Sequence, residues 1–171
     1  PFDERMHPTY VFESFDHVHD LHRADTALLF HQWRSAIAHR PEAVLLGEMD
    51  TRDVARFTSY VGDGRGLHAG FVLQLGLTRW DPERIAATIV DYQRHANGGC
   101  AWEVSNHDQA RAVSRYGGGE VGLRRTVALI TLLMALDGIP FLYQGEELGL
   151  PDAQLAGAPA DPMAARNAEG T

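Results

Sequence analysis

The sequence lacks several residue types, and each absence excludes a class of protein or of chemistry. All 15 basic residues are arginine, so the chain has no lysine for Schiff-base catalysis or for a P-loop phosphate site. Cys100 is the only cysteine, which rules out an internal disulfide. The longest apolar run, Thr126–Leu136, has 11 residues, whereas a membrane-spanning helix needs roughly 20. We therefore predict a protein without a disulfide framework or a transmembrane segment.

Positive charge is scarce relative to negative charge. The 171 residues carry 23 acidic and 15 basic groups, which gives a net charge of −8. Such a surface repels phosphate groups, so we expect neither nucleic acid nor an anionic membrane as a partner. Apolar residues make up 44% of the chain and charged residues 22%, which are the proportions of a soluble globular protein.

The beginning of the chain shows no targeting signal. Residues Pro1–Arg5 have neither the basic segment nor the apolar segment of a signal peptide, so we expect a cytoplasmic protein. The sequence also begins without methionine, which leads us to expect a segment of a longer protein.

Helix and strand patterns alternate along the chain. Short apolar runs predict four strands, at Ala43–Leu46, Phe71–Leu75, Trp102–Ser105 and Ile139–Tyr143. Capping residues and apolar periodicity predict helices at Asp25–Arg40, Asp50–Tyr60, Asp81–Asn97 and Val121–Leu136. Trp33 falls on the apolar side of the first helix, so we expect it in the core, and we expect the same of Trp102 inside a strand.

Strands that alternate with helices indicate an α/β fold with a parallel sheet and right-handed crossovers. A doubly wound sheet and a segment of a (β/α)8 barrel both agree with the pattern, and periodicity does not choose between them. Residues 151–171 are rich in Ala, Pro, Gly and Asp, which predicts a loop after the last strand.

Acidic residues follow three of the predicted strands. The first strand leads into Glu48, the third into Asp108, and the fourth into Glu146 and Glu147. Because the carboxyl ends of parallel strands meet at one edge of a sheet, we expect these side chains at the same rim. Two carboxyls in one cleft, such as Glu48 and Asp108, can have pKa values that are pushed apart, as glycoside hydrolysis requires. The alternative is that these acids are helix caps and solvated loop residues.

Three segments then show a specific resemblance. Leu45–Met49, Ser105–Arg111 and Gly138–Leu150 resemble three successive motifs of the α-amylase family of glycoside hydrolases, in its α-glucosidase and oligo-1,6-glucosidase branch. The resemblance implies a (β/α)8 TIM barrel, of which this chain covers roughly strands five to eight with their helices. Residues 1–171 would then be the second half of the catalytic domain.

The resemblance also implies roles for individual residues. Glu48 would be the general acid and base, and Asp108 the second catalytic carboxylate, which stabilises the transition state. His107 and Arg111 would bind substrate. Ala110 stands where the family commonly has proline. The nucleophile motif Gly-Phe-Arg-x-Asp does not occur in the sequence, so we expect the nucleophile in a missing N-terminal half and no turnover by this chain alone.

The resemblance implies a retaining hydrolase of α-1,4 or α-1,6 glucosidic bonds in short oligosaccharides. We expect no cofactor and no metal in this chain, although a calcium ion elsewhere in the full enzyme stays open. His17, His19 and His22 are close in sequence, and we expect a solvated segment there instead of a metal site. Two alternatives stay open: a family transferase or isomerase such as a trehalose synthase, and a non-catalytic binding or scaffold domain.

Overall fold

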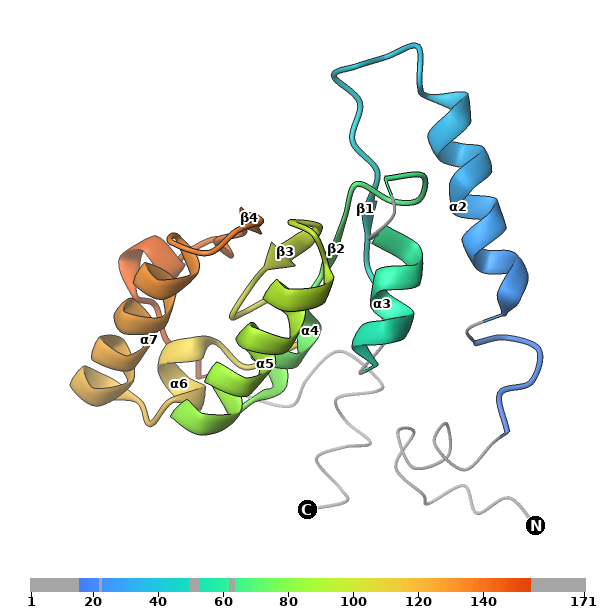
Figure 1. Ribbon diagram of the computed structural model, residues 1–171. Coiled ribbons are helices and arrows are strands. Elements are labelled where there is room, and N and C mark those ends of the chain that lie inside the picture. The colour runs from blue at the N-terminus through green and yellow to red at the C-terminus, as the bar shows by residue number, and fades with distance from the viewer. Residues whose placement is uncertain (1–15, 22, 50–52, 62–63, 155–171) are drawn as a thin grey trace. The chain divides into compact units, whose positions relative to one another are not determined.

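A computed structural model describes residues 16–21, 23–49, 53–61 and 64–154 of the chain. The chain divides into two units, of which one comprises residues 1–23 and 153–171 and the other comprises residues 24–152. Among the described residues, every helix and strand lies in the second unit (Figure 1). None of the helices in these ranges is both long and apolar enough to cross a membrane.

Four short strands form one parallel sheet in the order of the chain. They are β1 (Leu46–Gly47), β2 (Ala69–Phe71), β3 (Cys100–Trp102) and β4 (Ile139–Pro140). Leu46 lies opposite Ala69, and Ala101 lies opposite Ile139. A doubly wound sheet reverses its strand order at a switch point, whereas the strand order here does not reverse. The parallel α/β prediction is confirmed, and the order is that of a wall of a barrel.

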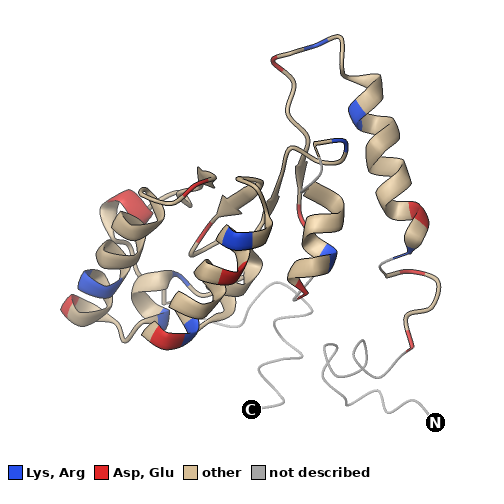
Figure 2. Cartoon of the chain, in the orientation of Figure 1, with Lys and Arg blue, Asp and Glu red and all other residues tan. Residues whose placement is uncertain are grey.

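Helices connect the strands. α2 (Ala24–Ala36) precedes β1, and the three long connections contain α3 (Val54–Val61), α5 (Pro82–His95) and α7 (Gly119–Leu133). The described residues also form three short helical turns, namely α4 (Leu73–Leu77), α6 (Ala112–Arg115) and the 3-10 turn η1 (Glu146–Leu148). The four strands carry no charged residue, and the charged residues of the described ranges belong to helices and loops (Figure 2).

Each predicted strand is longer than the observed one and overlaps it in only one or two residues; the third, Trp102–Ser105, shares only Trp102 with β3. β2 ends at Phe71, and residues 73–77 form α4, in which Leu75 is fully buried. An apolar run of this length packs equally well as a strand or as a buried helical turn, so hydrophobicity does not separate the two. The first strand begins at Leu46 instead of Ala43, and the last ends at Pro140.

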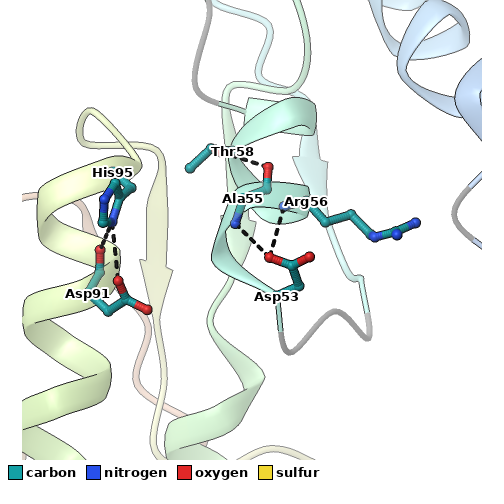
Figure 3. Close-up of polar contacts among 6 residues, drawn as sticks. All are labelled: Asp53, Ala55, Arg56, Thr58, Asp91 and His95. Carbon is teal, nitrogen blue, oxygen red and sulfur yellow. Dashed lines mark hydrogen bonds and ion pairs between the residues drawn. The ribbon is translucent and has the colours of Figure 1, made fainter.

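Local capping determines where two of the helices begin. The Asp81 side chain accepts a hydrogen bond from the backbone N–H of Arg84 at 3.1 Å, as predicted for the start of α5. Asp53 accepts from the N–H groups of Ala55 at 2.9 Å and Arg56 at 3.4 Å and so caps α3 (Figure 3). The sequence placed this start at residue 50 or 51, which lies outside the described residues.

The core contains a row of aromatic rings from α3, α5 and β3. The rings of Phe57 and Tyr92 have centroids 4.9 Å apart, and those of Tyr92 and Trp102 are 6.4 Å apart. Trp102 has no exposed surface, so its prediction as a core residue is confirmed. These rings join helices α3 and α5 to strand β3.

The prediction that Trp33 is a core residue is wrong. Its side chain is 46% exposed, and α2 has no buried residue. α2 instead directs Phe30 towards α3, where its ring meets that of Tyr60 edge-on with centroids 5.3 Å apart. Sequence periodicity identifies an apolar side of a helix but not the partner that covers it.

Candidate active site

A cleft lies at the carboxyl ends of the four strands. β1 leads into Glu48, β2 ends at Phe71, and the segments after β3 and β4 supply the remaining walls. The lining residues are Glu48, Phe71, Leu73, Glu103, Ser105, Asn106, His107, Phe141, Leu142 and Tyr143. The cleft therefore combines carboxyl, amide and imidazole groups with aromatic surface at the edge of a parallel sheet where such folds carry their chemistry.

Two of the predicted site residues line this cleft together. Glu48 is exposed directly after β1, and His107 lies in the turn after β3 with its side chain 70% exposed. Both groups are therefore accessible to a molecule that enters the cleft. The structure brings together residues that are far apart in the sequence because β1 and β3 both pair with β2.

Asp108 lies beside the cleft and is not among its lining residues. Its carboxylate is 64% exposed, with Oδ2 at 3.5 Å from Nε2 of His107. Its backbone N–H donates to Oδ1 of Asn106 at 2.9 Å, which fixes the turn on which it sits. Asp108 thus contacts His107, which lines the cleft, but does not line the cleft itself.

Arg111 contacts the segment after β4, which forms one wall of the cleft. Its Nη1 donates to the carbonyl oxygen of Gln144 at 2.8 Å, and its guanidinium lies 5.0 Å from the centre of the Tyr143 ring. Its backbone N–H donates to a carboxylate oxygen of Asp152 at 2.9 Å. These contacts connect the segment after β3 to the segment after β4 and hold Tyr143, which lines the cleft.

Glu103 is a cleft residue that the sequence reasoning missed. It is 6% exposed, and its Oε1 accepts a hydrogen bond from Nδ2 of Asn106 at 2.8 Å. Burial raises the pKa of its carboxyl, and the negative charges of Glu48 and Glu146 raise it further, while the Asn106 hydrogen bond lowers it. A signal was present, because a glutamate inside an otherwise apolar run that is read as a strand requires a polar partner.

Glu146 does not face the cleft with the other acids, contrary to the expectation from its place after β4. It is 7% exposed, and its Oε2 accepts from the backbone N–H of Tyr143 at 2.9 Å. Burial raises the pKa of this carboxyl, whereas the nearby charges of Arg115 and Arg111 lower it. Glu146 therefore holds the turn that carries Tyr143.

The described residues contain no group of three or more His, Cys, Asp or Glu side chains that could hold a metal ion. In the histidine-rich segment, Nδ1 of His17 lies 2.8 Å from a carboxylate oxygen of Asp20. His22 lies outside the described residues. The cleft lining includes the carboxyl groups of Glu48 and Glu103 and the imidazole of His107, groups that can exchange protons or hydrogen-bond a ligand.

Comparison with known proteins places these features in a family. The profile described as "Alpha amylase, catalytic domain" matches residues 5–169. A probable alpha-glucosidase of Rhizobium meliloti (strain 1021) is 32% identical over 145 residues, which covers 82% of this chain and 26% of the relative. An oligo-1,6-glucosidase of Heyndrickxia coagulans is 41% identical over 78 residues, covering 45% of this chain and 14% of the relative.

A solved structure shows the same fold. The trehalose-6-phosphate hydrolase of Bacillus licheniformis superimposes with a TM-score of 0.60 at 22% identity, over 75% of this chain and 26% of that one. The chain thus spans about a quarter of the length of the Rhizobium meliloti and Bacillus licheniformis proteins.

Proposed function

The chain belongs to the alpha-amylase catalytic-domain family, and from this we propose that the whole protein is a retaining glycoside hydrolase that cleaves α-glucosidic bonds in short oligosaccharides. The main observation that supports the proposal is that Glu48 and His107 line the same cleft at the carboxyl ends of the strands. The names of the similar proteins, alpha-glucosidase and oligo-1,6-glucosidase, support a substrate built from α-linked glucose.

In the proposed reaction Glu48 transfers protons. A carboxylate from the part of the protein outside this chain attacks the anomeric carbon, and Glu48 gives its proton to the departing glycosidic oxygen. Glu48 then takes a proton from water, whose oxygen replaces the enzyme carboxylate at the anomeric carbon. Two displacements leave the configuration unchanged. The exposed position of Glu48 directly after β1 supports this role, because a proton donor must reach the substrate oxygen.

The remaining cleft residues bind the sugar in this proposal. His107 hydrogen-bonds a ring hydroxyl, and Asp108, at 3.5 Å from its imidazole, favours the positive charge that develops on the ring. Phe71 and Phe141 pack edge to face with centroids 4.8 Å apart, and with Tyr143 they form the apolar wall against which a pyranose face can lie. Arg111 contributes to binding at the edge of the cleft, where its guanidinium holds Tyr143.

A family transferase or isomerase would use the same first displacement and would differ in the second, where a sugar hydroxyl replaces water. Product analysis separates the two activities. A hydrolase given maltose releases glucose as its product, whereas an isomerase forms a new disaccharide and a transferase forms glucose together with a longer oligosaccharide. A non-catalytic domain is disfavoured by the accessible Glu48, because a scaffold does not need an acid in the lining of a cleft.

The test is the Glu48→Gln variant of the full-length protein. We expect the rate on an alkyl α-glucoside to fall by about 10²- to 10⁴-fold, which is the range for loss of a general acid or base. Glycosides with a very good leaving group need no protonation, so their first displacement is spared. The matched control is Glu120→Gln, because Glu120 is 71% exposed on α7 and lies outside the cleft. An unchanged rate in Glu48→Gln contradicts the proposed role of Glu48.

A further inference from the structure

We infer that Glu103 is a positioning residue, which holds Asn106 and through it places His107 and Asp108 for the reaction. This inference rests on the proposed function, since it assigns Glu103 a part in the same cleft. The side chains concerned follow one another within the segment that leaves β3, so the position of one affects the next.

The Asn106 amide joins two parts of this segment. Its Nδ2 donates to Oε1 of Glu103 at 2.8 Å, and its Oδ1 accepts from the backbone N–H of Asp108 at 2.9 Å. These two partners fix the orientation of the amide, because the reverse orientation would place oxygen against the Glu103 oxygen and nitrogen against an N–H group. The backbone position of Asp108 thus depends on Asn106, and the rotamer of Asn106 depends on Glu103.

The other end of the turn is fixed independently. The Oγ atom of Ser105, which is 2% exposed, accepts from the backbone N–H of Ala112 at 2.9 Å, which is where α6 begins. The chain between these anchors carries His107 and Asp108, whose side chains are 70% and 64% exposed. Such exposed side chains have little packing of their own, so their placement depends on the hydrogen bonds of the backbone beneath them.

The burial of Glu103 also indicates a specific role. Its neighbours Trp102 and Val104 are apolar and are at most 1% exposed, and a third apolar residue would pack there without a desolvation cost. A carboxyl at this position is 6% exposed and lines the same cleft as Glu48. The hydrogen bond to Asn106 is the interaction that an apolar side chain could not supply.

The experiment measures kcat and KM of the full-length protein on an aryl α-glucoside for Glu103→Ala, Glu103→Gln, Asn106→Ala and the double variant Glu103→Ala/Asn106→Ala. We expect Glu103→Ala to lower kcat by about 10- to 100-fold, as is usual when reacting groups are misplaced by about an ångström. Glu103→Gln keeps an acceptor oxygen for Asn106 and restores most of the rate. The double variant loses no more than Asn106→Ala alone, because both changes break one link.

The matched control is Asp81→Ala, which removes the N-cap of α5 outside the cleft. If Glu103 only stabilises the fold, Glu103→Ala lowers the unfolding temperature as Asp81→Ala does and leaves kcat unchanged, which overturns the inference. Losses that add in the double variant also overturn it, because Glu103 would then act on the substrate without Asn106.

A crystal structure of Glu103→Ala separates this inference from the proposed function. Displacement of residues 105–109 supports the positioning role even if the wild-type protein hydrolyses no glucoside, a result that would reject the proposed function alone. An undisplaced turn rejects the positioning role. If Glu103→Ala does not fold, Asn106→Asp breaks the same link without a cavity, and we expect the same loss of kcat from it.

Discussion

At Gly138 a single added methyl group would meet both an unfavourable backbone conformation and closely packed neighbours. Gly138 precedes β4 and has φ +126°, a backbone conformation that L side chains rarely adopt. A Cβ at this position would lie 2.4 Å from the carbonyl oxygen of Cys100 and 2.8 Å from Nε1 of Trp102. That indole donates to the carbonyl oxygen of Asp137 at 2.9 Å, so it is not free to move aside.

The expected destabilisation by Gly138→Ala has two parts. Backbone strain at a positive φ costs roughly 1–3 kcal/mol. Forcing a methyl group into close-packed surroundings costs a further 1–3 kcal/mol, typically. The sum is about 2–6 kcal/mol, which is a large fraction of the roughly 5–15 kcal/mol that stabilises a folded domain.

Gly98→Ala is the matched control for this substitution. Gly98 has φ +78°, and a Cβ there would meet no atom within 4 Å. This variant therefore carries the backbone strain alone, about 1–3 kcal/mol. The difference between the two alanine variants measures the collision with the Cys100 carbonyl and the Trp102 ring.

The assay is urea unfolding of the full-length protein, followed by tryptophan fluorescence and by loss of the proposed hydrolytic activity. Comparison of midpoints at equal slope gives the change in the free energy of unfolding. We expect Gly138→Ala to unfold at clearly lower urea than Gly98→Ala, or to give no folded protein. Equal urea midpoints for the two variants would show that the added Cβ does not collide with Cys100 and Trp102 of β3, and would thus contradict the observed position of β4 beside β3.

Further predictions concern buried ionisable groups. Because burial raises the pKa of Glu103 above its ordinary value of 4.5, the folded state binds this proton more tightly than the unfolded state. The contribution of this protonated carboxyl to the free energy of unfolding is therefore full below about pH 4.5 and is lost as the pH rises through the raised pKa. Glutamine does not titrate, so we expect Glu103→Gln to become more stable relative to wild type in urea unfolding as the pH increases. A constant difference between the two proteins at all pH values would contradict this reasoning. Burial also raises the pKa of Cys100 to about 12, and the residue is 1% exposed. A disulfide reagent should thus label Cys100 only after denaturation, and fast labelling of the folded protein would show that β3 is not buried.

Local sequence predicted the features that neighbouring residues determine. Asp81 followed by Pro82 indicates a helix start, and the structure has the capping bond there. The alternation of helical and apolar segments predicted a parallel sheet, because consecutive crossovers of this length permit little else. The motifs around Glu48 and His107 identified the family, and strand order then explains why residues so far apart in sequence share a cleft.

The places where sequence reasoning failed depend on contacts between distant segments. Residues 73–77 form α4, in which Leu75 is fully buried, although an apolar run of this length also suits a strand. Trp33 is 46% exposed although its ring contacts that of Phe30, which packs against Tyr60 of α3. Neither outcome can be read from hydrophobicity, which states that a side chain prefers burial but does not identify what buries it.

The sequence by itself determined the family, the start of α5, and the presence of carboxyl and imidazole groups after the strands. Only the tertiary structure decided which of these groups share the cleft. It placed Glu48 and His107 in the lining and Asp108 beside it, and it buried Glu146 under a turn. It also revealed Glu103, whose hydrogen bond to Asn106 depends on where the segment after β3 turns. The physical reason is that burial and hydrogen-bond partners are properties of the packed chain, whereas residue type and spacing are properties of the sequence.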